Sequence, residues 1–144
     1  MKLIAIALAV AALASGKVIA GNPDAGRIKA GTCAGCHGTD GHSAGDVMPS
    51  LAGMDKRYLQ KSMLDFRSGA RPSTIMGRIA RGYSDEEIAA IAAFFSAQEW
   101  QQAPAKVNRK LVAEGKAIHE EQCESCHAGG GREGRDEVPR LAGQ

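Results

Sequence analysis

The chain has 144 residues, of which 44% are hydrophobic and 24% are charged, with a formal net charge of +2 at neutral pH. This length allows one ordinary domain or two very small ones. Between positions 21 and 144, Val, Ile, Leu and Phe number only 18, a share at which a chain usually lacks a sufficient core. In that range 16 basic residues balance 16 acidic ones, which argues against disorder and against nucleic-acid binding. The composition therefore requires something besides side chains at the centre of the fold.

The first twenty residues have the pattern of an export signal. Met1 and Lys2 precede an apolar run from Leu3 to Ala14, and Val18-Ile19-Ala20 supplies small residues for cleavage. This pattern predicts a secretory signal peptide at 1–20, because the apolar run is too short to span a membrane. The alternative is an N-terminal anchor that is not cleaved. We exclude these residues from the fold and expect an exported, periplasmic protein without a membrane span after signal cleavage.

The next eighty residues show helix signals and no convincing strand alternation. A first helix begins at Asn22-Pro23-Asp24, and Asp55 caps a second one that stops at Gly69. A short third helix follows, and Ser84 to Glu87 form a capping box that opens a last one. The apolar positions expected on the second, third and last helices are Leu59, Met63 and Phe66, then Ile75, Met76 and Ile79, then Ile88, Ile91, Ala92 and Phe95. The spacing predicts a small all-α bundle.

Four cysteines occur as two copies of the C-x-x-C-H motif, Cys33-Ala-Gly-Cys36-His37 and Cys123-Glu-Ser-Cys126-His127. Disulfides, a redox dithiol or a zinc site could use such pairs. Each of those interpretations leaves the two histidines unexplained. In C-x-x-C-H, both thiols form thioethers to a porphyrin and the histidine becomes the proximal iron ligand. The two motifs therefore predict two attachment sites for haem c.

An internal repeat connects the two motifs. The second lies 90 residues after the first, and Pro49-Ser-Leu-Ala-Gly recurs as Pro139-Arg-Leu-Ala-Gly at the same offset. The polar stretch 98–107 is typical of a linker. We therefore expect a first domain at 21–100 and the N-terminal half of a second domain at 101–144. Because half a domain hardly forms a core alone, we interpret the chain as a fragment; the alternative is a natural short form.

The iron of the first site needs a sixth ligand or stays open. The candidates are Met48, Met54, Met63, Met76 and His42, with lysine as a weak further option. Met76 lies 39 residues after His37 and beyond a full helix, which favours an approach from the distal face. Ligation by His and Met closes the iron to substrates and suits electron transfer. No methionine follows position 76, and His119, one helical turn before Cys123, is expected to face solvent or pack locally.

These motifs are similar to those of class I cytochromes c. The chain resembles the dihaem cytochrome subunits of flavocytochrome c sulfide dehydrogenases and, more broadly, the cytochromes c4. The matching stretches are Cys33-Ala-Gly-Cys-His-Gly-Thr-Asp-Gly, Pro49-Ser-Leu-Ala-Gly, Asp65-Phe-Arg-Ser-Gly, Ser73-Thr-Ile-Met-Gly-Arg-Ile-Ala-Arg-Gly-Tyr-Ser and Asp85-Glu-Glu-Ile. The resemblance implies tandem class I domains, the second one incomplete here, with Met76 as distal ligand. It also implies that the carbonyls of Pro49 and Pro139, each twelve residues past a motif histidine, accept that histidine's N–H.

The resemblance implies a one-electron relay with no catalytic residue of its own. A flavoprotein sulfide dehydrogenase subunit would oxidise sulfide, and the haems would pass the electrons to a soluble acceptor. A free cytochrome c4-type carrier that feeds a terminal oxidase is the nearest alternative. A different class is a haem protein that binds a small ligand or acts as a peroxidase through an open second haem.

Overall fold

The computed structural model describes residues 23–45, 47–102 and 106–144, so the predicted signal peptide lies outside the described residues. The helices are α1 (Pro23–Ala30), α2 (Ala34–His37), α3 (Lys56–Ser68), α4 (Met76–Ala80), α5 (Asp85–Ser96) and α6 (Arg109–Gln122). Two short 3-10 turns, Gly31–Cys33 and Thr39–Gly41, flank α2. The described ranges hold no strand, only an isolated bridge between Arg135 and Val138. The predicted all-α class is confirmed.

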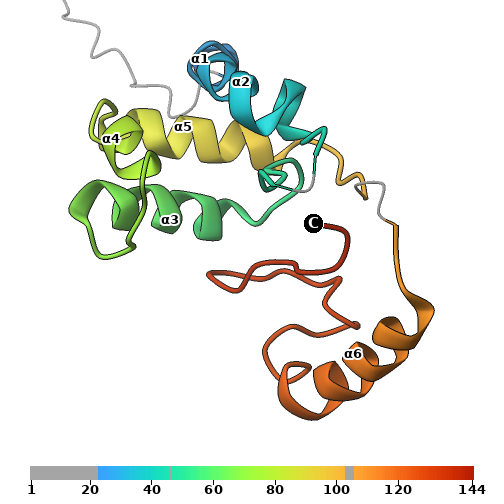
Figure 1. The fold of residues 1–144 in the computed structure, drawn as a ribbon. Helices are drawn as coiled ribbons and strands as arrows, with labels where there is room; N and C mark the ends of the chain where they lie inside the picture. Colours follow the sequence, from blue (N-terminus) through green and yellow to red (C-terminus); the bar gives the residue numbers. More distant parts are fainter. Residues whose placement is uncertain (1–22, 46, 103–105) are drawn as a thin grey trace, which may run out of the picture.

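Helix α5 is the centre of the core and lies between α1 and α3 (Figure 1). Its N-terminus has the predicted capping box, in which the Ser84 side chain accepts from the Glu87 N–H while the Glu87 side chain accepts from the Ser84 N–H. The four predicted apolar positions of α5 are all buried: Ile88, Ile91, Ala92 and Phe95. Burial of each large apolar side chain contributes about 1.5–3 kcal/mol. The stripe read from the sequence is therefore the surface that organises this bundle.

Helix α1 packs closely against α5 because Gly26 has no side chain. A Cβ at Gly26 would lie 2.6 Å from the Ala90 carbonyl oxygen. Beside this contact, Lys29 Nζ lies 2.6 Å from Glu87 Oε1. Ala30 is buried at the end of α1, whereas Ile28 is 75% exposed. The close approach of α1 brings the first cysteine motif onto the bundle.

Helix α3 begins and ends where the sequence predicted. The Asp55 side chain accepts from the Arg57 N–H, and Gly69 adopts the left-handed conformation with φ 86°. Leu59 on α3 is buried against α5, while Met63 and Phe66 are half-buried. Helix α4 packs on α3, with Gly77 close to the Phe66 carbonyl. These contacts fix the position of Met76, the first residue of α4.

The later part of the chain is organised differently. Helix α6 has no buried residue, and Leu111, Val112 and Ile118 are each more than half exposed. Residues 131–144 then run back toward the first unit, so that the last residue lies beside the loop that precedes α3 (Figure 1). Within the described ranges, no helix is long and apolar enough to cross a membrane.

Candidate haem sites

The first motif spans a 3-10 turn and α2, which places Cys33, Cys36 and His37 within little more than one helical turn. All four cysteines of the chain are free. Cys33 is half-buried and Cys36 is exposed. Burial raises the pKa of the Cys33 thiol, and the Thr32 hydroxyl, 4.0 Å from its Sγ, opposes part of that rise. The two thiols are therefore unpaired and available for thioether bonds.

His37 has a defined tautomer in this structure. Its Nδ1 lies 2.8 Å from the Pro49 carbonyl oxygen, and the residue is only 8% exposed. Because a carbonyl only accepts, Nδ1 is the donor in this bond, and Nε2 is the ring nitrogen that remains for another partner. A hydrogen bond of this kind orients a ligating imidazole and raises its basicity. The predicted partners His37 and Pro49 are thus brought together, with Nε2 left to bind a metal.

Glycines close the loop that returns Pro49 to His37. Gly38 has φ 76°, and a Cβ there would lie 1.8 Å from the His42 carbonyl oxygen. The Gly41 carbonyl accepts from the Leu51 N–H at 2.8 Å. The Gly53 N–H in turn donates to the Phe95 carbonyl at 2.9 Å, which ties the loop to α5. This backbone network decides where the Pro49 carbonyl points.

The second motif repeats this arrangement. His127 Nδ1 lies 2.9 Å from the Pro139 carbonyl oxygen. The Gly131 carbonyl accepts from the Leu141 N–H at 2.8 Å, as Gly41 does from Leu51. Cys123 is half-buried and Cys126 is exposed, as in the first motif. The two halves of the sequence repeat therefore share these hydrogen bonds around their histidines, although residues 123–127 form turns where residues 34–37 form helix α2.

Met76 stands at the N-terminus of α4 with a half-buried side chain. The Ser73 hydroxyl accepts from the Gly77 N–H at 2.7 Å and fixes this turn. No hydrogen bond joins Met76 to the first motif in the part of the chain that is described. Of the other candidates, Met54 is buried in the core and Met48 is 43% exposed. Met76 therefore lies on a different helix from His37. Two ligands that approach a flat ring from opposite faces must come from separate parts of the fold in this way.

His119 packs locally. Its Nδ1 lies 3.1 Å from a carboxylate oxygen of Glu124, and its side chain is 20% exposed. Glu124 also accepts from the Gly129 N–H at 2.8 Å. The histidine Nε2 is buried near Gly131 and has no hydrogen-bond partner among the described residues. These contacts hold the loop after the second motif.

The residues present fit a haem. Each unit offers two free thiols and an imidazole whose Nε2 is left for the iron. The first unit also exposes large apolar side chains that its own core does not cover, among them Ile28, Val47, Met48, Ile75 and Ile79. These side chains are accessible to a further apolar group. A porphyrin supplies an apolar surface of this kind.

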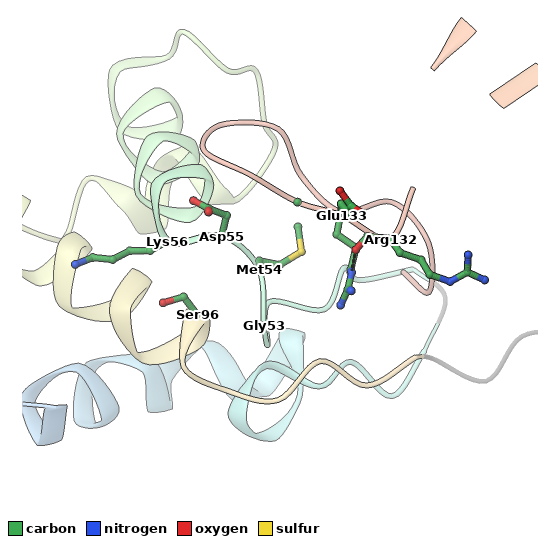
Figure 2. A pocket seen from close by; sticks show the side chains of 9 residues that line it. Gly53, Met54, Asp55, Lys56, Ser96, Arg132 and Glu133 are labelled. Atoms are coloured by element: carbon green, nitrogen blue, oxygen red, sulfur yellow. Dashed lines mark hydrogen bonds between the residues drawn. The ribbon is translucent and has the colours of Figure 1, made fainter. Parts of the chain in front are cut away.

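The two units also meet at contacts that sequence reasoning missed. A cleft of about 590 Å³ lies between them, with Met54 on one side and Arg132 and Glu133 on the other (Figure 2). None of the cysteines or motif histidines lines it. The Arg140 guanidinium stacks 4.6 Å from the Trp100 ring centroid, and Arg57 pairs with Asp136. No local pattern predicts these pairs, because their members lie far apart in the chain.

Comparisons with known proteins agree with this geometry. Residues 24–98 match the model of the family described as Cytochrome c. The cytochrome subunit of sulfide dehydrogenase from Chlorobaculum tepidum is 50% identical over 70 residues, which cover 49% of this chain and 63% of that protein. Cytochrome c4 from Pseudomonas aeruginosa is 38% identical over 120 residues, covering 78% of this chain and 59% of that protein. The chain thus spans about three fifths of the length of these two relatives.

A solved structure extends the similarity to both units. Reduced recombinant cytochrome c4 from Pseudomonas stutzeri superposes with a TM-score of 0.74 at 30% sequence identity. The match covers 85% of this chain and 73% of that one. The resemblance inferred from the motifs is therefore confirmed, together with the class I fold. The chain belongs to the cytochrome c family of electron-transfer proteins, in which the paired cysteines hold haem c.

Proposed function

We propose that this chain binds two haem c groups and relays single electrons in the periplasm. The electrons would come from a flavoprotein sulfide dehydrogenase subunit and pass to a small soluble acceptor. The observation that carries the proposal is the repeated geometry of two free-thiol motifs, each with its histidine Nδ1 within 2.9 Å of a proline carbonyl. The predicted signal at 1–20 supports export to the periplasm, where haem c attachment and sulfide oxidation would occur.

We assign the site residues from this geometry and the motifs. The thioether-forming residues are Cys33, Cys36, Cys123 and Cys126. His37 and His127 are the proximal ligands, oriented by Pro49 and Pro139. Met76 is the distal ligand of the first site, at a helix N-terminus that Ser73 fixes. The second site has no assigned distal ligand.

The residues of the chain position the redox group and restrict its chemistry. When bound, the haem supplies a one-electron change at iron. The cysteines would hold the ring, and the Nδ1–H bonds keep each imidazole in one orientation so that little would rearrange on electron transfer. The Met76 thioether, as an iron ligand, would raise the potential and block substrate access at the first site. The chain itself breaks no substrate bond.

Sequence similarity supports the sulfide dehydrogenase partner. The relative of that name shares half of its residues with this chain over 70 positions. A free cytochrome c4-type carrier that feeds a terminal oxidase is the second candidate. It is favoured by the c4 structure, which superposes over 85% of this chain and so includes both units.

The partner test is reduction by sulfide. The holoprotein is expressed together with a flavoprotein sulfide dehydrogenase subunit and purified through a tag on the flavoprotein. We expect copurification and full haem reduction when sulfide is added, with no reduction by sulfide when the flavoprotein is left out. A holoprotein that neither binds the flavoprotein nor accepts its electrons, but reduces an oxidase, would establish the c4-type alternative.

A ligand test addresses the open second haem. Carbon monoxide is added to the reduced holoprotein, and the absorbance of each haem is followed. A saturable spectral change of one haem, together with peroxidase turnover, would favour the ligand-binding class over a pure electron relay.

A further inference from the structure

One peptide group is hydrogen-bonded on both sides and joins the two units. The Pro49 carbonyl accepts from His37 Nδ1 at 2.8 Å. The N–H of the same peptide group, that of Ser50, donates to Gln144 Oε1 at 2.9 Å. The Gln144 amide completes the pair by donating from Nε2 to the Ser50 carbonyl at 3.1 Å. A side chain of the second repeat thus engages the peptide group that holds the first histidine.

The surroundings keep this chain of bonds in place. Ser50 is only 5% exposed, and its hydroxyl accepts from the Ser43 N–H at 3.2 Å. Met54 is 4% exposed, and its sulfur lies 3.5 Å from Gln144 Nε2. Where water is excluded, hydrogen bonds in series polarise one another and become stronger. The bond from Ser50 to Gln144 therefore increases the negative charge on the Pro49 carbonyl oxygen.

We propose that Gln144 is a positioning residue that lowers the reduction potential of the first haem through the Pro49–Ser50 peptide group. The inference rests on the proposed role of His37 as the iron ligand. A more negative Pro49 oxygen is a better acceptor, so it draws the Nδ1 proton and makes the imidazole more basic. A more basic ligand favours the oxidised iron over the reduced one. The second unit would in this way set the potential of the first.

The repeat itself makes the effect one-sided. In the repeat, Ser50 of the first unit corresponds to Arg140 of the second, and Gln144 of the second unit corresponds to Met54 of the first. A methionine has no carbonyl to accept the peptide N–H. The described residues show no hydrogen bond from the Arg140 N–H. The Pro139 carbonyl is therefore left without the polarisation that Pro49 receives, and the two haems are expected to differ in potential.

The direct test is Gln144→Met, which gives the second repeat the residue of the first. The holoprotein is titrated potentiometrically while the paramagnetically shifted His37 signals are followed by NMR. We expect the equilibrium constant for reduction of the first haem to increase about threefold. At 59 mV per tenfold change, its potential then rises by about 28 mV. Hydrogen exchange of the Ser50 amide should become about fivefold faster. The potential of the second haem should not change.

A second variant predicts the opposite sign. Gln144→Glu keeps an acceptor for the Ser50 N–H and adds a negative charge, but it removes the Nε2–H donor to the Ser50 carbonyl. The potential of the first haem should therefore fall, and the Ser50 amide should exchange more slowly than in Gln144→Met. The matched control is Arg57→Gln with Asp136→Asn, which removes another contact between the units without a change in net charge. The control should leave the first potential unchanged.

The outcomes separate this inference from the proposed function. If the oxidised wild-type protein has no paramagnetically shifted His37 signal, His37 is not the ligand and the proposed function is wrong. If His37 is the ligand but Gln144→Met leaves the first potential unchanged, the inference is wrong. It is also wrong if the Arg57–Asp136 control shifts that potential as much, because the effect would then come from loosening the interface.

Discussion

Helices α1 and α6 have corresponding places in the sequence repeat but different surroundings. Gly26 on α1 lies so close to α5 that a Cβ would be 2.6 Å from the Ala90 carbonyl oxygen. Gly115 on α6 corresponds to Gly26 once one extra residue is allowed in the second copy, since Glu114-Gly115-Lys116 matches Ala25-Gly26-Arg27. It has no atom within 4 Å of a Cβ built on it. Yet the loops that follow the two helices have the same histidine–proline bond. The loop geometry is therefore a property of the repeated segment, whereas the packing of the helix depends on what covers it.

The largest expected effect comes from removing one haem attachment site at a time. Cys33→Ser with Cys36→Ser should abolish the cooperative thermal transition of the first unit, since its apolar residues are too few to form a core without the haem. Cys123→Ser with Cys126→Ser should keep that transition, because α1, α3 and α5 pack without α6. Pyridine haemochrome absorbance and circular dichroism measure both. A first unit that unfolds cooperatively without its haem would contradict our interpretation of the composition.

The two glycines give a matched pair of substitutions. Gly26→Ala should lower the free energy of unfolding by about 1–3 kcal/mol, because the added methyl group meets rigid backbone on α5. Gly115→Ala should not destabilise the protein, and its better helix propensity is worth about 0.8–1 kcal/mol to α6. Thermal unfolding of the two holoprotein variants measures the difference. Equal effects of the two changes would show that α1 and α6 have the same environment in solution.

The helix caps extend the comparison at smaller magnitude. Ser84→Ala removes the capping box of α5 and should lower the free energy of unfolding of the first unit by about 1 kcal/mol. Asn108→Ala removes the N-terminal cap of α6. In this cap the Asn108 side chain accepts from the Lys110 N–H at 2.9 Å. Because α6 has no buried residue, the second change should reduce helix content without moving the main transition. Circular dichroism during thermal unfolding separates these outcomes.

The smallest effect concerns the ion pair between α1 and α5. The hydrogen bond with Glu87 raises the pKa of Lys29, and the same bond lowers the pKa of Glu87. The Glu87 contribution to stability is thus complete above the unfolded carboxyl pKa of about 4.3 and is lost as the pH falls through the lower folded value. The Lys29 contribution is complete below the unfolded pKa of about 10.4 and is lost as the pH rises through the higher folded value.

Glu87→Gln tests this pH dependence. Glutamine retains the side-chain acceptor of the capping box but has no charge. We expect flatter acid and alkaline limbs when the free energy of unfolding is measured against pH. The control Glu86→Gln removes a neighbouring carboxylate that bonds Ser84 and not Lys29. Because the Ser84 bond also lowers the pKa of Glu86, the control should flatten the acid limb and leave the alkaline limb unchanged. An alkaline limb that flattens equally in both variants would argue against the Lys29 pair as its cause.

Much of the fold could be predicted because its signals are local. The capping box at Ser84, the Asp55 cap and the Gly69 stop each depend on bonds within a few residues, so the sequence nearby determines them. The stripe on α5 has the same basis, since a helix places residues three and four apart on one face. Ile28 shows the limit of such reasoning, because it is apolar and is nevertheless 75% exposed on α1.

The sequence alone predicted the local bonds of the two motifs. Two C-x-x-C-H motifs at one offset, each with a proline twelve residues on, predict two similar histidine–proline contacts because imidazole and carbonyl lie within one short segment. Only the tertiary structure decided how the units meet. Gln144 hydrogen-bonds Ser50, 94 residues away in the chain, and Arg140 stacks on Trp100. Both contacts depend on where α5 and the segment 131–144 lie in space. A spacing rule acts along the chain, whereas these contacts form only after the helices have packed.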